Sequence, residues 1–196
     1  STLQKHLSGM DILEILNHIH PLSKEAGQKI VQYSTEINLP KGHIILEADK
    51  TETSVYFIKK GIVRAFAPKE EKDITFWFGR EGDPIVSMKS YVDNKPGYEC
   101  VELLEDCELY EIKNHDLQQL FLEDISIANW GRKFAEALLL HTEERLISKL
   151  FKSAKERYLE LLEDNPDFVQ RIQLGYIASY LGITQVSLSR IRAEIK

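Results

Sequence analysis

The feature that most constrains the fold is a string near the end of the chain, residues 174–192, in which helix-forming residues surround one glycine. A helix-turn-helix needs a small residue inside its first helix, because the second helix crosses there at close range. It also needs a residue that tolerates a positive φ in the turn, four residues later. Ala178 and Gly182 are residues of these types at this spacing. The string therefore predicts two short helices joined by a tight turn.

The remaining positions of residues 174–192 agree with this register. Thr184 is placed to cap the second helix through its hydroxyl group. A purely structural helical hairpin with a solvated polar face is the alternative, but the number of matching positions favours a helix-turn-helix. The positions that the motif must bury are all apolar: Ile177, Leu181, Ile183, Leu188 and Ile191.

The exposed face of the predicted second helix carries residue types that bind DNA. Glutamine pairs with adenine and arginine with guanine in the major groove, whereas hydroxyl groups suit phosphate oxygens. The sequence thus predicts a double-stranded DNA interface at this helix. We expect it to consist of Thr184, Gln185, Val186, Ser187, Ser189, Arg190 and Arg192.

The distribution of charge bears on this expectation. The formal net charge of the 196-residue chain is −6, and such an acidic total argues against a nucleic-acid partner. The charge is unevenly spread, however. Residues 171–196 carry Arg171, Arg190, Arg192 and Lys196 against Glu194 alone, a net +3, so the rest of the chain carries −9. The basic excess lies where the motif places DNA.

The first part of the chain has a different pattern. Two short helices are expected within the first 31 residues, capped by Ser8 and Ser23. Short β-type runs then follow at intervals of 8–12 residues, which predicts an antiparallel sandwich or barrel. Lys60-Gly61 between two of these runs predicts a hairpin. The runs are residues 34–39, 43–46, 54–59, 62–67, 74–78, 98–104 and 108–112.

After Asn114 the pattern becomes helical, with a long helix predicted over residues 126–153. Around residues 137–140 this helix is apolar on every side, and such a helix is buried on more than one face. One face is expected on the barrel and the other on a symmetry mate. We therefore expect three parts: a sensor barrel (1–125), a dimerisation helix (126–153) and a DNA-binding unit (154–196). The expected dimer interface is Ile127, Trp130, Phe134, Leu138 and His141.

Together these parts resemble the cyclic-AMP receptor protein and fumarate-nitrate regulator (Crp/Fnr) family. The resemblance implies an α+β chain with an N-terminal antiparallel jelly-roll of the cyclic-nucleotide-binding, cupin-like type. It further implies a homodimer that places two recognition helices ~34 Å apart on a pseudo-palindromic site, with RNA polymerase as a candidate partner. Base-reading positions would be Gln185, Val186 and Arg190, where Val186 replaces an acidic residue common in the cyclic-AMP-responsive branch. The matching segments are residues 39–45, 56–61, 81–83, 177–184 and 188–191.

The ligand-binding positions of this family are not retained. Its ribose-binding glutamate corresponds to Ser87, and its phosphate-binding arginine and serine correspond to Gly97 and Tyr98. A buried phosphate needs a cation or a cluster of N–H donors. We therefore expect no tight binding of cyclic AMP, no certain cofactor and an unknown small-molecule effector. Arg64 and Arg80 are more typical of solvated residues than of substitutes for the missing arginine. The candidate pocket is Arg64, Arg80, Ser87, Met88, Lys89 and Tyr98.

Other chemistry has little support in the sequence. Two cysteines are too few for an iron–sulfur cluster and fit a reducing cytosol. The histidines suggest no metal site, and no phosphate loop, nucleophile elbow or carboxylate pair predicts an enzyme. The longest apolar stretch has four residues, so no membrane span is expected, and residues 1–20 lack the core of a signal peptide. The residues after Ile191 are too few for the usual β-wing.

We therefore expect a cytoplasmic transcription regulator. Two alternatives stay open at this point. One is a cupin-like small-molecule-binding protein or enzyme whose helical tail is only structural. The other is an interaction adaptor that has lost DNA binding.

Overall fold

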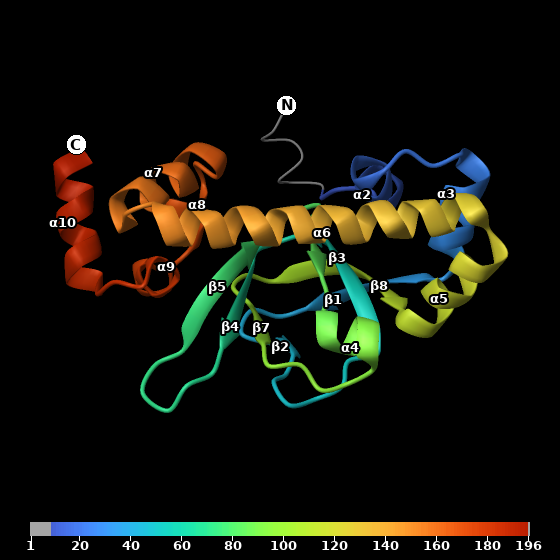
Figure 1. Cartoon of the computed structure of the whole chain (residues 1–196), viewed down its shortest axis with the longest axis horizontal. Coiled ribbons are helices and arrows are strands. Elements are labelled where there is room, and N and C mark those ends of the chain that lie inside the picture. Colours follow the sequence, from blue (N-terminus) through green and yellow to red (C-terminus); the bar gives the residue numbers. More distant parts are fainter. Residues whose placement is uncertain (1–8, 196) are drawn as a thin grey trace.

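The computed structural model describes residues 9–195 and shows a strand-rich barrel with a long helix alongside it and a helical unit at one end (Figure 1). The helices are α2 (Ile12–Ile19), α3 (Lys24–Gln32), α4 (Met88–Asp93), α5 (Asn114–Glu123), α6 (Ile125–Phe151), α7 (Ala154–Asp164), α8 (Phe168–Arg171), α9 (Leu174–Leu181) and α10 (Gln185–Ile195). The strands are β1 (Ser34–Leu39), β2 (Ile44–Leu46), β3 (Ser54–Lys60), β4 (Val63–Ala67), β5 (Ile74–Gly79), β6 (Pro84–Ile85), β7 (Cys100–Leu103) and β8 (Cys107–Lys113).

The strands form two antiparallel sheets, in the orders β1-β8-β3-β6 and β2-β7-β4-β5. Every run predicted as a strand contains one, and the predicted jelly-roll architecture is confirmed. One side of each sheet contributes to a shared apolar core, with Ile58 and Leu109 from the first sheet and Val63 and Val101 from the second. The two-residue strand β6 and the short helices α4 and α8 were not predicted, because each is too short to show a periodicity.

The predicted hairpin at Lys60-Gly61 is wrong. β3 pairs with β8 and β6, whereas β4 pairs with β5 and β7, so the chain crosses from one sheet to the other at this point. Gly61 has φ 115°, and a Cβ there would lie 2.4 Å from the Sγ of Cys107. Turn residues between two β-type runs show that the chain changes direction, but they do not show which strand becomes the partner.

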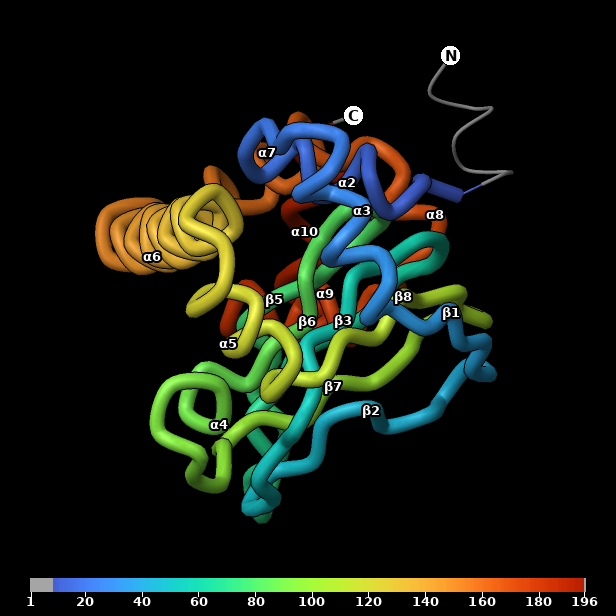
Figure 2. The backbone as a smooth tube through the Cα atoms, turned by 90° about the vertical axis from the view of Figure 1, so that its right-hand side faces the viewer, coloured from blue at the N-terminus to red at the C-terminus, as the bar shows by residue number. Residues whose placement is uncertain are grey.

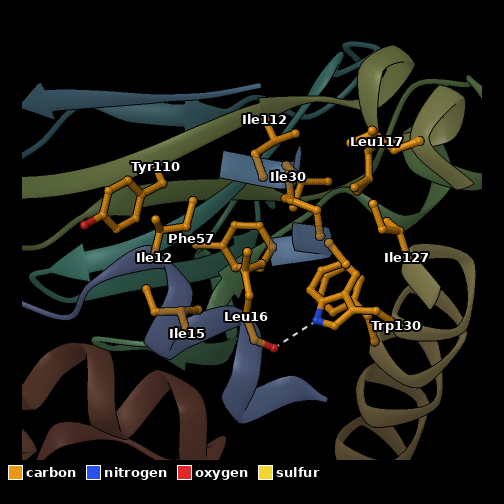
Figure 3. Packing of buried hydrophobic residues seen from close by; sticks show 14 residues of the cluster. Ile12, Ile15, Leu16, Ile30, Phe57, Tyr110, Ile112, Leu117, Ile127 and Trp130 are labelled. Atoms are coloured by element: carbon orange, nitrogen blue, oxygen red, sulfur yellow. Dashed lines mark hydrogen bonds between the residues drawn. The ribbon is translucent and has the colours of Figure 1, made fainter. Parts of the chain in front are cut away.

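A second core lies between the first sheet and the helices (Figure 3). Phe57 of β3 points out of the barrel and meets Leu16 of α2 and two rings of α6, those of Trp130 and Phe134. These two rings stack with centroids 5.3 Å apart, and the indole N–H of Trp130 donates to the carbonyl of Leu16 at 2.9 Å. The first half of α6 is therefore part of the barrel's own core, and Figure 2, which looks nearly along α6, shows the helix at the side of the barrel.

The beginnings of the helices follow capping chemistry. Ser23 caps α3 as predicted, because its hydroxyl accepts from the N–H of Ala26. Helix α2 is capped by Asp11; Ser8, the predicted cap, lies outside the described residues. Asp124 caps α6 by accepting from the N–H groups of Ser126 and Ile127. The long helix thus begins one residue before the predicted start and ends two residues before the predicted end.

The predicted dimer interface needs correction. Ile127, Trp130 and Phe134 are fully buried inside the protomer, so they have no surface to offer a second copy. Leu138 packs partly against the same core, and His141 is exposed beside Glu144. Apolar helix positions look alike in sequence whichever partner buries them, which explains the error. Apart from Ile125 at its first position, the large apolar residues that α6 leaves exposed come later: Leu139, Leu140, Leu146, Ile147, Leu150 and Phe151.

Candidate nucleic-acid interface

Helices α9 and α10 form the predicted helix-turn-helix. Helix α9 ends at Gly182, which has φ 70° in the left-handed region that favours glycine. The N–H groups of Gly182 and Ile183 close the turn by donating to the carbonyls of Ser179 and Ala178, each at 3.1 Å. Ala178 is almost completely buried, as a close helix crossing requires. The spacing of a small residue and a glycine therefore has the structural role that the sequence predicted.

Apolar contacts and one cap hold α10 in place. Thr184 caps the helix, since its hydroxyl accepts from the N–H of Ser187 at 3.1 Å. Arg157 of α7 donates to the carbonyl of Leu181, which satisfies an acceptor at the end of α9. The positions predicted to be buried pack in one cluster, fully for Ile177, Leu181 and Leu188 and partly for Ile183 and Ile191.

The outer face of α10 carries the predicted DNA-contacting residues, and Figure 1 shows α10 at the end of the molecule away from the barrel. The hydroxyl of Ser189 donates to the carbonyl of Gln185, and that of Ser187 lies 3.0 Å from the hydroxyl of Thr184. Within residues 9–195, the side chains of Gln185 and Arg190 make no hydrogen bond or ion pair. Thr184, Gln185, Val186, Ser189 and Arg190 are exposed, whereas Ser187 and Arg192 are half-buried.

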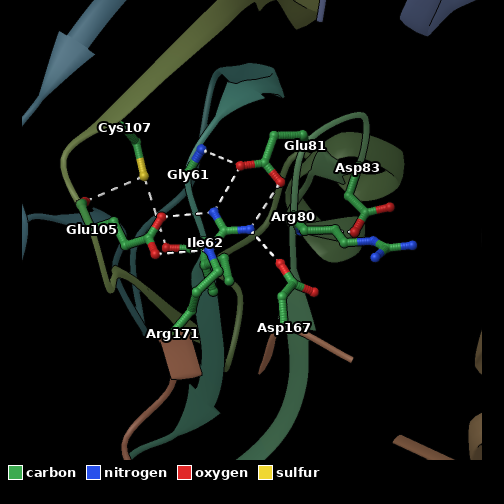
Figure 4. A network of polar contacts seen from close by, with 9 residues as sticks. All are labelled: Gly61, Ile62, Arg80, Glu81, Asp83, Glu105, Cys107, Asp167 and Arg171. Atoms are coloured by element: carbon green, nitrogen blue, oxygen red, sulfur yellow. Dashed lines mark hydrogen bonds and ion pairs between the residues drawn. The ribbon is translucent and has the colours of Figure 1, made fainter. Parts of the chain in front are cut away.

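The basic residues of this region are not all available to DNA. Arg171, which contributes to the local excess of positive charge, binds carboxylate oxygens of Glu81, Glu105 and Asp167 at 2.8 Å each (Figure 4). Partial burial alone would lower the pKa of Arg171, but the hydrogen bonds to the three carboxylates outweigh it and raise the pKa. Arg190 and Arg192 are therefore the arginines left to meet phosphate or bases.

Arg64 was a candidate for the effector pocket, but its guanidinium faces α9 instead. It lies between the rings of Phe66 and Tyr176, 4.0 Å from each centroid, and pairs with Glu102 at 2.9 Å. Only 4% of its surface is exposed, so the expectation of a solvated residue is also wrong. The alternation in β4 carries a signal that was missed: Val63 and Ala65 point into the barrel, so Arg64 must point out of it.

The other candidate pocket residues lie apart. Met88 and Lys89 are exposed on α4, and Tyr98 is exposed with its ring 6.1 Å from that of Phe76. Arg80 is half-buried, and its backbone N–H donates to Asp83. Burial raises the pKa of Asp83 despite this bond and the nearby Arg80 charge.

Ser87 and Gly97 do come together, and a carboxylate joins them. A Cβ at Gly97 would lie 2.5 Å from the Oγ of Ser87 and 2.9 Å from the Oε2 of Glu99. Glu99 is 8% exposed and accepts from the N–H of Tyr98, and it forms no ion pair within the part of the chain that the structure describes. The hydroxyl of Ser87 is buried without a hydrogen-bond partner. Glu99 was missed because the comparison of motif positions ended at Tyr98.

Among residues 9–195, no group of three or more histidine, cysteine, aspartate or glutamate side chains is placed to hold a metal ion. In the same residues no helix has the length and apolar character needed to cross a membrane.

This arrangement of barrel, long helix and helix-turn-helix is similar to that of known proteins. Residues 36–124 match the family of the cyclic nucleotide-binding domain. FixK2 from Bradyrhizobium japonicum is 20% identical with a TM-score of 0.72, covering 83% of this chain and 84% of that chain. The catabolite activator protein of Thermus thermophilus is 20% identical with a TM-score of 0.58, covering 92% and 86%. A protein of Eubacterium rectale described as a Crp/Fnr-family regulator is 17% identical with a TM-score of 0.69, covering 87% and 82%.

No curated protein sequence matches the chain. The two kinds of similarity nevertheless agree, because the matched segment covers most of the jelly-roll together with α5, and the solved structures cover 83% and 92% of the chain. Residues 36–124 thus match the cyclic nucleotide-binding domain family, and the chain has the fold of the Crp/Fnr-type regulators.

Proposed function

We propose that the protein is a DNA-binding transcription regulator of the Crp/Fnr type that acts as a homodimer. The observation that carries the proposal is the two-sided character of α10. One side is fixed in an apolar cluster through Leu188, while the other presents the exposed side chains of Gln185 and Arg190 to solvent. The fold shared with the Eubacterium rectale protein described as a Crp/Fnr-family regulator supports this use of the helix.

The residues on the outer face fit the chemistry of the major groove. Arg190 suits the two acceptors of guanine, and Gln185 suits the donor and acceptor of adenine. Val186, which is 63% exposed, suits the methyl group of thymine. The exposed hydroxyl groups of Thr184 and Ser189 are of the type that contacts phosphate oxygens. In a dimer, the two copies of α10 would read half-sites separated by one turn of DNA, ~34 Å.

The second half of α6 supplies the surface for the homodimer. Leu139 and Leu146 are seven residues apart, as are Leu140 and Ile147, and all four are exposed in the single chain. Apolar residues that recur every seven residues lie on one side of a helix, where they can pack against the same residues of a second copy. These residues replace the interface that the sequence predicted earlier in the helix.

We also propose that the barrel does not bind cyclic AMP tightly. The positions where the family binds ribose and phosphate hold Ser87, Gly97 and Tyr98, and the buried carboxylate of Glu99 lies beside them. An anionic phosphate placed there would meet a like charge in a poorly solvated site. A thermal-shift titration tests this point: stabilisation by several degrees with micromolar cyclic AMP would contradict it.

The main test is selection of DNA by the wild-type protein from a random-sequence duplex library, followed by anisotropy titrations at several salt concentrations. We expect a two-half-site duplex that binds more tightly than unselected DNA. Arg190→Ala should reduce that preference by about 1–3 kcal/mol, the usual value of one good base contact. Arg132→Ala removes an exposed arginine from α6, far from α10, and should leave the preference unchanged. If no duplex is enriched at any salt concentration, the proposed function is wrong.

A further inference from the structure

The DNA-reading unit, residues 154–195, is attached to its own barrel at three places. The first is Arg171 at the end of α8, whose guanidinium binds two carboxylates of the barrel, Glu81 and Glu105. Its third partner, Asp167, belongs to the reading unit itself. Charge-assisted bonds to a planar guanidinium fix orientation as well as distance. Arg171 therefore holds the reading unit in one direction relative to the barrel.

The second attachment joins α9 to the edge of a sheet. Strand β5 is the last strand of its sheet, so among residues 9–195 no strand pairs with one side of its backbone. Ser179 of α9 fills part of this side: its hydroxyl accepts from the N–H of Thr75 and donates to the carbonyl of Asp73, both at 3.0 Å. One serine thereby acts as a short substitute for a paired strand.

The third attachment is apolar and aromatic. Phe78 of β5 lies 6.0 Å from the ring of Phe168 and 5.5 Å from that of Tyr180. Arg64 of β4 stacks on Tyr176 of α9. Barrel residues and reading-unit residues share one buried cluster here, so the reading unit does not hang from α6 alone.

We propose that Arg171 and Ser179 are positioning residues that fix the angle of the reading unit on its own barrel, and through that angle the distance between the two recognition helices of a dimer. The inference rests on the proposed function. The attachments occupy α8, α9 and the barrel side of the unit, and they leave Gln185 and Arg190 exposed. The attached state is therefore able to meet DNA.

The physical advantage of this attachment is preorganisation. A reading unit that moved freely about the end of α6 would lose conformational freedom on binding and would accept half-sites at several separations. A fixed unit engages both half-sites only when their separation matches the protein. The attachment is thus expected to determine which spacing of half-sites is bound, while the side chains of α10 determine which bases are read.

The charged part of the attachment is complete at neutral pH. Burial alone would raise the pKa of Glu81, but the hydrogen bonds from Arg171 and from the N–H of Gly61 lower it overall. Glu81 is therefore ionised opposite Arg171 under ordinary conditions.

The experiment compares the dissociation constant of the duplex selected by the wild type with that of the same duplex carrying two extra base pairs between the half-sites. The wild type should lose at least about tenfold in affinity on this insertion, since one half-site can no longer be engaged. In Arg171→Gln, and separately in Ser179→Ala, the loss should shrink to less than about threefold. Because the readout is a ratio within one protein, the charge removed from Arg171 affects both duplexes alike.

The matched control is Glu36→Gln. Glu36 forms a barrel ion pair with Lys59 at 2.6 Å and touches no residue of the reading unit among the described contacts. It should retain the wild-type ratio. A variant that keeps the wild-type spacing preference although its reading unit is detached would overturn the proposal.

Detachment is measured independently by hydrogen exchange of the Thr75 amide, whose acceptor is Ser179. Arg171→Gln should accelerate this exchange although Arg171 does not touch Thr75, while circular dichroism stays that of the folded protein. Unchanged exchange would show that Arg171 does not hold the unit, which also overturns the proposal. Failure of the wild type to select any duplex would refute the proposed function instead, so the two failures are distinguishable.

Discussion

The two halves of α6 look alike in sequence and differ completely in the structure. In the first half, Ile127, Trp130 and Phe134 are buried by the protomer's own helices and first sheet. In the second half, Leu139 is 71% exposed and Leu150 is 66% exposed. The comparison shows that the apolar content of a helix predicts burial but does not identify the surface that buries it. The first half completes the barrel's core, and the second half presents the proposed dimer surface to solvent.

The two halves differ in burial because the surface of the protomer that faces α6 is apolar along the first half and polar along the second. The first half meets Phe57 of β3 and the apolar face of α2. Further along, α6 turns Arg145 inward, where burial lowers its pKa and where Tyr180, Tyr98 and Asp83 interact electrostatically with it. The inward face has become polar at that point, so the apolar residues of the second half are left on the outward face.

The largest expected effect is a loss of stability when the first half of α6 is altered. Trp130→Ala removes a fully buried indole and should destabilise the protomer by about 3–5 kcal/mol, as measured by chemical unfolding. Leu122→Ala, at an exposed leucine of α5, should stay within about 0.5 kcal/mol of the wild type. A loss below about 1 kcal/mol for Trp130→Ala would show that this half is not part of the barrel's core.

Substitutions in the second half of α6 should change the oligomeric state of the protein and leave the fold of the protomer unchanged. Leu139→Glu combined with Leu146→Glu places charges in the proposed dimer surface and should weaken the dimer at least about tenfold. Light scattering coupled to gel filtration measures the change in mass, and circular dichroism should show the protomer still folded. Leu122→Glu makes the same replacement at an apolar residue outside this surface. If it dissociates the dimer equally, or if the double variant remains dimeric, the interface is not on this half of α6.

This contrast also explains how much could be predicted from the sequence. Local structure could be predicted: Ala178 and Gly182 indicated a close helix crossing, and short β-type runs between turn residues indicated the strands. What the sequence could not supply was the choice of partner, which depends on contacts distant in the chain. The crossover at Gly61 looked like a hairpin, and Trp130 looked like an interface residue. Arg64 is a mixed case, because its outward direction was predictable but the helix covering it was not.

The same limit applied to the candidate site. The exposed face of α10 follows from a period of 3.6 residues, so the residues proposed to contact DNA could be chosen from sequence. The contacts of Arg171 join residues far apart in the chain. A count of charges therefore assigned Arg171 to the predicted DNA-binding surface, whereas its guanidinium binds carboxylates of the barrel. Glu99 was missed for a similar reason, since its proximity to Ser87 results from the fold of the segment around α4.

A smaller expected loss of stability distinguishes the contribution of the Trp130 hydrogen bond from that of its apolar packing. Trp130→Phe keeps an aromatic ring beside Phe134 but loses the donor to the Leu16 carbonyl. It should cost about 1 kcal/mol beyond the loss of ring area, the usual net value of a buried hydrogen bond. Trp77→Phe is the matched control, because its indole N–H has no acceptor within the described residues. Equal costs for the two variants would mean that the bond to Leu16 contributes nothing to anchoring α6.

The smallest effect concerns the first turn of α6, where Asp124 binds Lys29 of α3 at 2.7 Å. The hydrogen bond from Lys29, followed by that from Ser126, holds the pKa of the Asp124 carboxyl well below its usual range. A group whose pKa is lowered by folding stabilises the protein above its unfolded value, about 3.9, and that contribution is lost as the pH falls further. Asn in place of Asp124 keeps a capping oxygen but not the charge. The Tm of Asp124→Asn should therefore lie slightly below that of the wild type from pH 5 to 8. The difference should shrink with added salt and below about pH 4.

Glu160→Gln gives the corresponding measurement for the second half of α6. Glu160 of α7 accepts hydrogen bonds from Lys152 and Ser148 at the other end of the helix, and these bonds lower its pKa in the same direction. A difference in Tm that keeps its full size at pH 2.5 in either variant would show that packing or capping, and not the charge pair, holds that end of α6.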